Sequence, residues 1–169
     1  MDFADLLLQA RRMKNNEDLS AALDPAQESF EIRKWPFYHL ARLTSLYAQR
    51  MDAALKPLGI DVPRWRVLAL LHENGASTVT QLSQEAVSKI STMTKIVQRM
   101  TAEKLVTVHT SSEDARSTQV VISDQGLQIL EVVQEKVGRI GRIAFDGVHS
   151  EEIARLNSIC ERLYENLAH

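Results

Sequence analysis

Residues 80–116 constrain the fold most, because the spacing of the hydrophobic residues changes within this stretch. Apolar residues first recur at helical spacing, in a short segment ending near Ala86 and a second one that starts at Ser88 or Lys89 and ends near Glu103. β-Branched residues then flank a polar loop, which is typical of a β-hairpin. Two short helices followed by a hairpin predict a winged helix-turn-helix.

The hairpin is predicted from β-branched residues at 106–108 and 120–122, on either side of the polar segment 111–117. Ser123 then caps a long helix that we expect to run to about residue 146. A last helix starts at Ser150, whose following acids suit the positive end of a helix dipole.

Two longer helical segments precede the short ones. Pro36 suits the first turn of a helix that ends at Leu58, before Gly59. Pro63 opens the next helix, and Thr78 or Thr80 caps the third. The outer helices carry apolar stripes that a thin winged head cannot bury, so we expect an obligate homodimer.

The fold class is therefore mainly α, with a winged helix-turn-helix head and long N- and C-terminal helices that form a dimerisation domain. We assign the head to residues 61–123 and the dimerisation helices to residues 36–60 and 124–169. Residues 1–35 form an N-terminal arm, with a short amphipathic helix over residues 2–14.

Charge is distributed unevenly along the chain. The formal net charge of the 169 residues is −2, which argues against a non-specific polycationic coat for nucleic acid. From Ser88 to Met100 there are three bases and no acid, whereas from Asp124 to His169 eight acids face five bases. The positive charge thus collects on the second helix of the predicted head.

That helix has an unusual polar side. Met93, Ile96, Val97 and Met100 point inward. Serine and threonine are poor fillers of a solvent-exposed helix, whereas all the remaining types suit phosphates and base edges of double-stranded DNA. The candidate DNA-binding residues of this helix are Ser88, Lys89, Ser91, Thr92, Thr94, Lys95, Gln98 and Arg99. An ordinary solvated face is the alternative for such a helix considered alone.

The loop of the hairpin adds a second indication. Asp114 precedes Arg116 by two residues, so it can fix the loop while the arginine enters a narrow minor groove. An ordinary charged turn would have the same composition, but this one directly follows a helix-turn-helix.

Residues 63–126 resemble the MarR family of bacterial transcription regulators. The matching pieces are the RWRVLALLHENGASTVTQLSQ, STMTKIVQRM, LVTV and VVISDQG segments and the Asp114-x-Arg116 wing. The resemblance implies that Ser91, Thr92, Thr94, Lys95 and Arg99 belong to a recognition helix, that Arg116 reaches the minor groove, and that Asp114 supports the wing. It also implies a pseudo-palindromic operator. Many relatives have a glycine where this chain has Lys104, which would adopt a left-handed cap at a cost.

The family commonly senses small aromatic acids between the dimerisation helices and the head. Aromatic walls with a cation and a histidine suit a phenolic carboxylate. The candidate effector-binding residues are Trp35, Tyr38, His39, Arg42 and Trp65. Core packing of the aromatic residues is the alternative, and an aromatic acyl-CoA thioester is another possible effector because the N-terminal arm could border a larger site.

Other function classes find little support in the sequence. We expect Cys160 to be a buried small hydrophobe, because it falls on an apolar helix face, and redox sensing through this thiol is the alternative. No metal-ligand spacing, phosphate loop, nucleophile elbow or HExxH motif is present, so we expect no metal, no cofactor and no enzyme. The first residues read as neither signal peptide nor membrane span, which favours a cytoplasmic location without membrane attachment. A winged helix used only for protein contacts remains a competing function.

Overall fold

The computed structural model describes residues 23–110 and 118–168 of the chain. Two compact units are present, residues 1–49 and 50–169, and each is described by itself. The expected helix at 2–14 lies outside the described residues, as do Asp114 and Arg116 of the wing.

In the first unit, the 3₁₀-helix η1 (Ile32–Lys34) leads into the long helix α2 (Pro36–Leu55), which continues into the second unit. Aromatic rings pack edge to face around this start. The ring centroid of Trp35 lies 6.0 Å from that of Phe30 and 5.3 Å from that of Phe37. The predicted helix over residues 36–58 is confirmed, with its last turn tightened into the 3₁₀-helix η2 (Lys56–Leu58).

Local signals set the start of α3 (Val62–Asn74). Gly59 ends η2 with a left-handed backbone, φ 69°. Asp61 then caps α3, because its side chain accepts a hydrogen bond of 2.9 Å from the backbone N–H of Arg64. The sequence predicted that this helix starts at Pro63, and the observed start at Val62 is one residue earlier.

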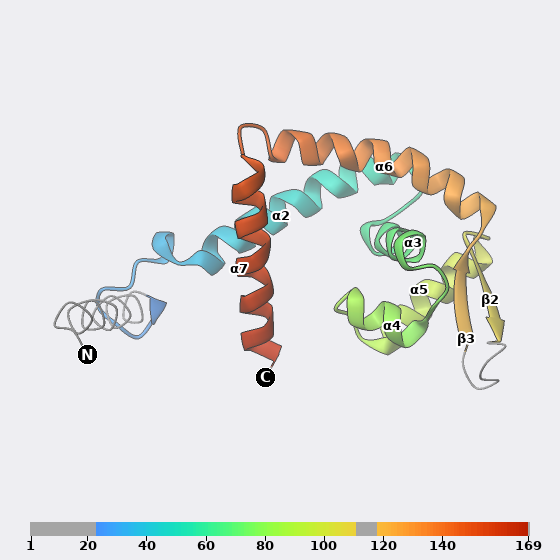
Figure 1. Ribbon diagram of the computed structural model, residues 1–169, viewed down its shortest axis with the longest axis horizontal. Helices are drawn as coiled ribbons and strands as arrows, with labels where there is room; N and C mark the ends of the chain where they lie inside the picture. Colours follow the sequence, from blue (N-terminus) through green and yellow to red (C-terminus); the bar gives the residue numbers. More distant parts are fainter. Residues whose placement is uncertain (1–22, 111–117, 169) are drawn as a thin grey trace, which may run out of the picture. The chain divides into compact units, whose positions relative to one another are not determined.

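The helices α4 (Val79–Glu85) and α5 (Ile90–Ala102) form the predicted helix-turn-helix and pack against each other (Figure 1). Thr78 is the cap of α4. It forms a capping box with Gln81, in which each side chain bonds to the backbone N–H of the other residue.

The hairpin consists of β2 (Val106–Thr110) and β3 (Thr118–Ile122), paired antiparallel with Val108 opposite Val120. A third strand, β1 (Ser77–Thr78), pairs with the other edge of β3, so the strand order is β1-β3-β2. The sequence did not predict β1, because two polar residues carry no strand pattern.

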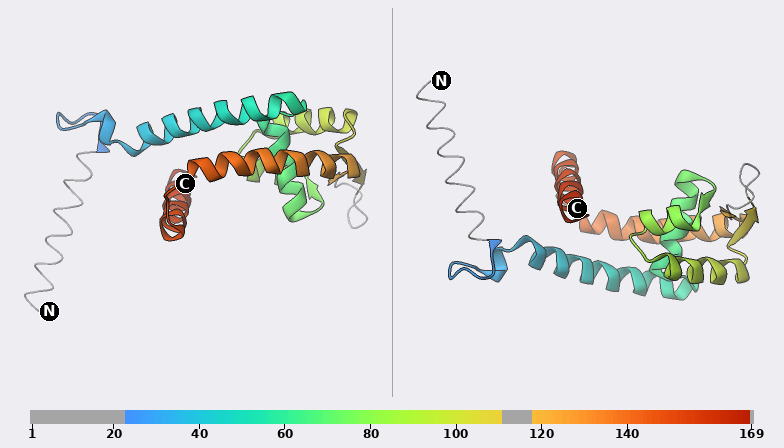
Figure 2. Two further views of the ribbon diagram at one scale, coloured as in Figure 1. Left: turned by 90° about the horizontal axis from the view of Figure 1, so that it is seen from above. Right: turned by 90° about the horizontal axis from the view of Figure 1, so that it is seen from below.

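Helix α6 (Asp124–Ala144) continues directly from β3 after the cap Ser123, as both views of Figure 2 show. Helix α7 (Ser150–Ala168) follows. The core of the second unit lies between the end of α2, the head helices, the sheet and the first half of α6. Its largest fully buried side chains are Met51, Leu55, Leu68, Leu71, Leu82, Met93, Met100 and Leu130.

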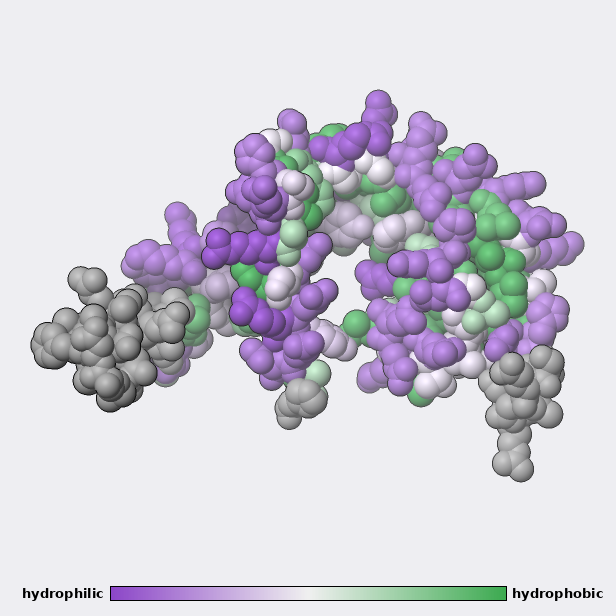
Figure 3. All heavy atoms as spheres, in the orientation of Figure 1, coloured by the Kyte–Doolittle hydropathy of each residue, from purple (hydrophilic) through white to green (hydrophobic). Residues whose placement is uncertain are grey.

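Much of the apolar surface of the outer helices is not covered by the described residues of one chain. Helix α7 holds no buried residue. Hydrophobic side chains show at the surface over α6 (Figure 3). The exposed large apolar residues of α2, α6 and α7 include Leu43, Leu46, Val132, Ile143, Leu156, Ile159 and Leu167.

Candidate DNA-binding surface

The turn before α5 is held by backbone hydrogen bonds at the end of α4. The N–H of Ser88 donates to the carbonyl of Ser83 at 2.8 Å, and the N–H of Val87 donates to that of Gln84 at 3.1 Å. This pattern is a Schellman motif, and it places Val87 in the left-handed region at φ 50°. These backbone hydrogen bonds therefore fix the orientation of α5 relative to α4.

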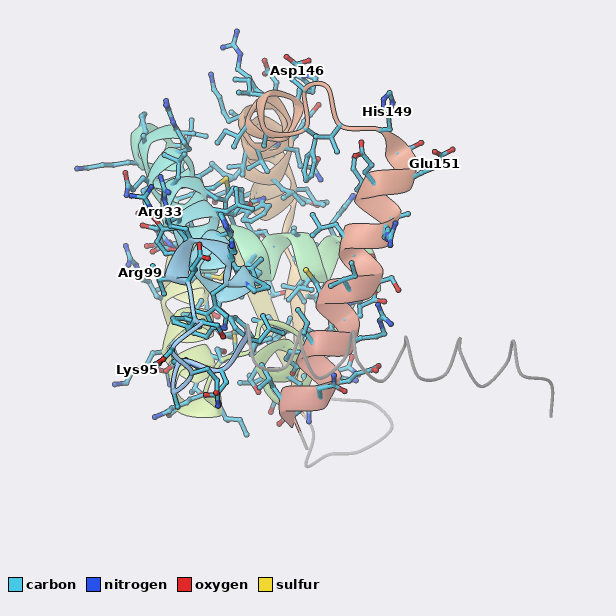
Figure 4. All side chains as sticks on the ribbon, turned by 90° about the vertical axis from the view of Figure 1, so that its left-hand side faces the viewer. Arg33, Lys95, Arg99, Asp146, His149 and Glu151 are labelled. Atoms are coloured by element: carbon cyan, nitrogen blue, oxygen red, sulfur yellow. The ribbon has the colours of Figure 1, made fainter. Side chains whose placement is uncertain are left out.

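The inward side of α5 is as predicted. Met93, Val97 and Met100 are buried, and Ile96 is half-buried against the same core. Five of the predicted DNA-binding residues gather on the opposite side, where all of them are exposed: Ser91, Thr92, Lys95, Gln98 and Arg99. Figure 4 shows Lys95 and Arg99 extending to the same side of α5, one turn apart. The arrangement presents two cations and three hydrogen-bonding groups on one helix face.

The three other predicted residues of this region lie at the edges of the face. Lys89 is exposed and is the N-cap residue of α5. Thr94 is half-buried, and its hydroxyl donates to the carbonyl of Ile90 at 2.8 Å. Ser88 is also half-buried, and its hydroxyl is enclosed without a hydrogen-bond partner among the described residues. These two hydroxyls face the protein more than the solvent.

Two apolar residues at the start of α5 were not among the sequence candidates. Val87, in the turn before α5, is 70% exposed, and Ile90, its first residue, is 55% exposed. Recognition helices direct this end toward base edges. No sequence signal marks them, because apolar residues beside an inward stripe are expected in a core. Only the fold shows that the core ends before them.

In the first unit, four predicted effector residues lie around the start of α2. The guanidinium of Arg42 donates to the Tyr38 hydroxyl at 3.1 Å and lies 5.3 Å from the centroid of that ring. Nε2 of His39 lies 2.6 Å from the carbonyl oxygen of Arg33. Tyr38, His39 and Arg42 line an open hollow of about 680 Å³ along α2. Trp35 is half-buried against Phe37.

The fifth predicted effector residue, Trp65, belongs to the second unit. It is half-buried and packs against the core cluster of the head. Its indole Nε1 is enclosed and has no hydrogen-bond partner among the described residues.

The expectation for Cys160 is wrong within a single chain, because the thiol is exposed. The physical reason is that nothing in the described part of the chain packs on the apolar face of α7, which has no buried residue. An apolar helix face predicts burial only where a partner surface exists.

Within residues 23–110 and 118–168, no three histidine, cysteine or acidic side chains converge as a metal site would require. The described helices also include none that is both long and apolar enough to cross a membrane.

A capped helix-turn-helix, an exposed cationic face on its second helix and a hairpin after it define the class of winged-helix DNA-binding transcription regulators. Comparison with known proteins agrees. The sequence profile of the MarR family matches residues 58–117. The chain is 44% identical over 144 residues to the HTH-type transcriptional repressor IacR of Pseudomonas putida, covering 85% of this chain and 86% of that protein. This protein belongs to the MarR family.

Solved structures support the same fold. BpsR from Bordetella bronchiseptica, whose structure concerns regulation of DNA binding by 6-hydroxynicotinic acid, aligns with a TM-score of 0.71 at 16% identity, over 80% of this chain and 96% of that one. A mutant MarR from E. coli complexed with operator DNA aligns with a TM-score of 0.66 at 18% identity, over 76% and 93%. The fold class is confirmed, and the protein is a transcription regulator of this family rather than an enzyme.

Proposed function

We propose that the protein binds a pseudo-palindromic operator as a homodimer and is released from it by a small aromatic carboxylic acid. The observation that carries the proposal is the exposed face of α5, with Lys95 and Arg99 beside three hydrogen-bonding side chains. On the operator, we expect α5 to lie in the major groove and Arg116 to enter the minor groove, while Asp114 supports the wing.

The exposed apolar residues of α2, α6 and α7 support a homodimer. Large apolar side chains are exposed on each of these helices, and a two-fold interface would bury the same side chains on both subunits. The symmetry of such a dimer would place its two recognition helices in successive major grooves, with half-site centres about 10 bp apart.

The aromatic and cationic groups at the start of α2 support an aromatic acid as effector. Arg42 is exposed beside the ring and hydroxyl of Tyr38, so a carboxylate could pair with the guanidinium while the ligand ring packs on an aromatic wall. The open hollow along α2 brings Tyr38, His39 and Arg42 to one side of the helix, where a small ligand could reach all three. BpsR, which shares the fold, has its DNA binding regulated by an aromatic acid.

Release requires that the effector distinguish two states of the dimer. A ligand shifts an equilibrium only by the difference of its affinities for the two states, so the acid must favour a spacing of the heads that the operator does not accept.

The DNA-binding part is tested with Lys95→Ala and Arg116→Ala on an operator recovered by random-oligonucleotide selection. Each substitution should weaken binding in a gel-shift assay and lower the slope of log affinity against log salt by about 1, because one cationic contact with DNA is lost. Arg139→Ala is the matched control, since it removes an exposed cation from α6. Unchanged affinity in both head variants would reject the assignment, and no DNA enrichment would favour a protein-contact module.

The effector is tested by a thermal-shift screen of aromatic carboxylic acids and their CoA thioesters. A ligand at about 100 times its dissociation constant stabilises the folded state by about 2.7 kcal/mol. The shift should be lost in Arg42→Ala, whereas Arg50→Ala, further along α2, should keep it. A response to thioesters alone would favour the acyl-CoA alternative.

Redox sensing through Cys160 is the second alternative, and the exposure of this thiol in one chain is the observation that favours it. Cys160→Ser should abolish any release from the operator by peroxide. An unaltered peroxide response in this variant would exclude redox sensing through Cys160.

A further inference from the structure

Arg64 is a buried charge in the first turn of α3. Its side chain is only 6% exposed, which is costly for a cation unless partners compensate. Its Nη2 donates to the carbonyl of Gly59 at 2.7 Å, and its Nη1 donates to Oε2 of Glu103. Its Nε lies 3.2 Å from Oδ2 of Asp61, an ion-pair distance without hydrogen-bond geometry. Arg64 thus joins the turn after η2, the cap of α3 and the end of α5.

The same two carboxylates also hold Arg99, a predicted DNA contact. The Nε of Arg99 donates to Oε1 of Glu103 at 2.9 Å, and its Nη1 lies 3.6 Å from Oδ2 of Asp61. Glu103 therefore uses one carboxylate oxygen for Arg64 and the other for Arg99. The two arginines are thus linked through the two carboxylates. The side chain of Arg64 is buried, whereas that of Arg99 is 59% exposed.

This arrangement leaves part of the Arg99 guanidinium free. Its Nε donates to Glu103 and its Nη1 lies within ion-pair distance of Asp61, whereas Nη2 has no partner among the described residues. A guanidinium is a rigid fork, so fixing one edge also fixes the direction of the other. Holding a long side chain in one geometry before binding removes part of the entropy cost that would otherwise oppose complex formation.

We propose that Glu103, Asp61 and Arg64 are positioning residues for DNA binding. The two carboxylates orient Arg99 toward the operator backbone, and the buried Arg64 fixes both carboxylates while balancing their charge. The inference rests on the proposed function, because it assumes that Arg99 contacts the operator.

The direction in which Glu103→Gln changes operator affinity distinguishes positioning of Arg99 from a simple charge effect. Glu103→Gln removes a negative charge next to the DNA-binding face, which by charge alone should strengthen DNA binding. If Glu103 orients Arg99, the same substitution should instead weaken operator binding by about threefold, the lower end of couplings measured within one network. Glu85→Gln removes an acid from α4 that bonds to Asn74, away from Arg99, and serves as the matched control with unchanged or stronger binding.

The decisive experiment is a double-mutant cycle with Glu103→Gln and Arg99→Ala in the full-length protein. Operator affinity is measured by fluorescence anisotropy, and melting temperature confirms that each variant is folded. Arg99→Ala should weaken binding, and adding Glu103→Gln should then no longer weaken it further, because the residue it positions is gone and only the charge effect remains. Asp61→Asn should behave like Glu103→Gln without unfolding α3, since asparagine is an equally good cap.

Two outcomes overturn the inference separately from the proposed function. If Glu103→Gln has the same effect with and without Arg99, Glu103 does not act through Arg99 and the network only fastens α3 to α5. If Glu103→Gln strengthens binding, the carboxylate merely repels DNA. Unchanged affinity in Arg99→Ala and Lys95→Ala together would instead reject α5 as the DNA-binding helix.

Discussion

Two residues of the head hold a left-handed backbone without being glycine. Val87 follows α4 at φ 50°, and Lys104 follows α5 at φ 58°. At the second site the N–H of Leu105 donates to the carbonyl of Met100 at 2.9 Å and that of Lys104 donates to Thr101 at 3.0 Å, the two bonds of a Schellman motif. Lys104 does adopt the left-handed cap for which many relatives use glycine, and these bonds offset its cost.

Replacing Lys104 with glycine should therefore stabilise the protein. The left-handed conformation costs an ordinary residue about 1–2 kcal/mol, and part of the gain is lost to the greater freedom of glycine in the unfolded chain. We expect the free energy of unfolding to rise by about 0.5–1 kcal/mol in urea denaturation. Lys104→Ala is the control, because alanine keeps the strain and should give no such gain. Equal stabilisation by both substitutions would assign the effect to the lysine side chain instead.

At the scale of elements, the start of α6 is clamped to the end of α5. The Ser123 hydroxyl donates to the carbonyl of Lys104 at 2.6 Å and accepts from the N–H of Gly126 at 3.0 Å, while the N–H of Ser123 donates to the carbonyl of Leu105 at 3.1 Å. Gly126 is required at this approach. A Cβ atom built there would lie 2.2 Å from the carbonyl oxygen of Leu105.

Gly126→Ala should accordingly destabilise the head. The clash is with backbone, which cannot turn aside as a flexible side chain could, so we expect a loss of about 2 kcal/mol or more in the free energy of unfolding. Gly141→Ala in the same helix is a matched control of opposite sign. No atom lies within 4 Å of its added Cβ, and a helix-interior alanine should stabilise by about 1 kcal/mol. A stable Gly126→Ala protein would show that α5 and α6 do not approach this closely.

For the whole molecule, the question is what covers the apolar faces of the outer helices. Leu156 is 41% exposed on α7, in line with Ile153, Cys160 and Leu163 along one side. If a second copy covers this side, each substitution on it changes the free energy of dimerisation twice, because both subunits contribute the same residues to the interface.

Leu156→Glu should convert the dimer into monomers. Burying an unpaired carboxylate in an apolar interface costs several kcal/mol, so the dissociation constant should rise by about 100-fold or more. Sedimentation velocity over a range of concentrations measures this change. Ser158→Glu places the same charge on the opposite side of α7 and should leave the dimer intact. A Leu156→Glu protein that stays dimeric would place the interface elsewhere.

The sequence by itself determined where most elements begin and end. Caps such as Thr78 and Ser123 and the stop at Gly59 act within one helical turn, so the residues that decide a boundary are neighbours in the chain. The inward side of α5 was predictable for the same reason, because a helix repeats its faces over a few residues.

Only the tertiary structure decided features that join distant parts of the chain. Strand β1 exists because β3 offers it a free edge, not because Ser77 and Thr78 favour a strand. Arg64 and Glu103 are 39 residues apart, and no local pattern predicts that one carboxylate serves both Arg64 and Arg99. The exposure of Cys160 also depended on the fold, because periodicity identifies an apolar face but not the surface that would cover it.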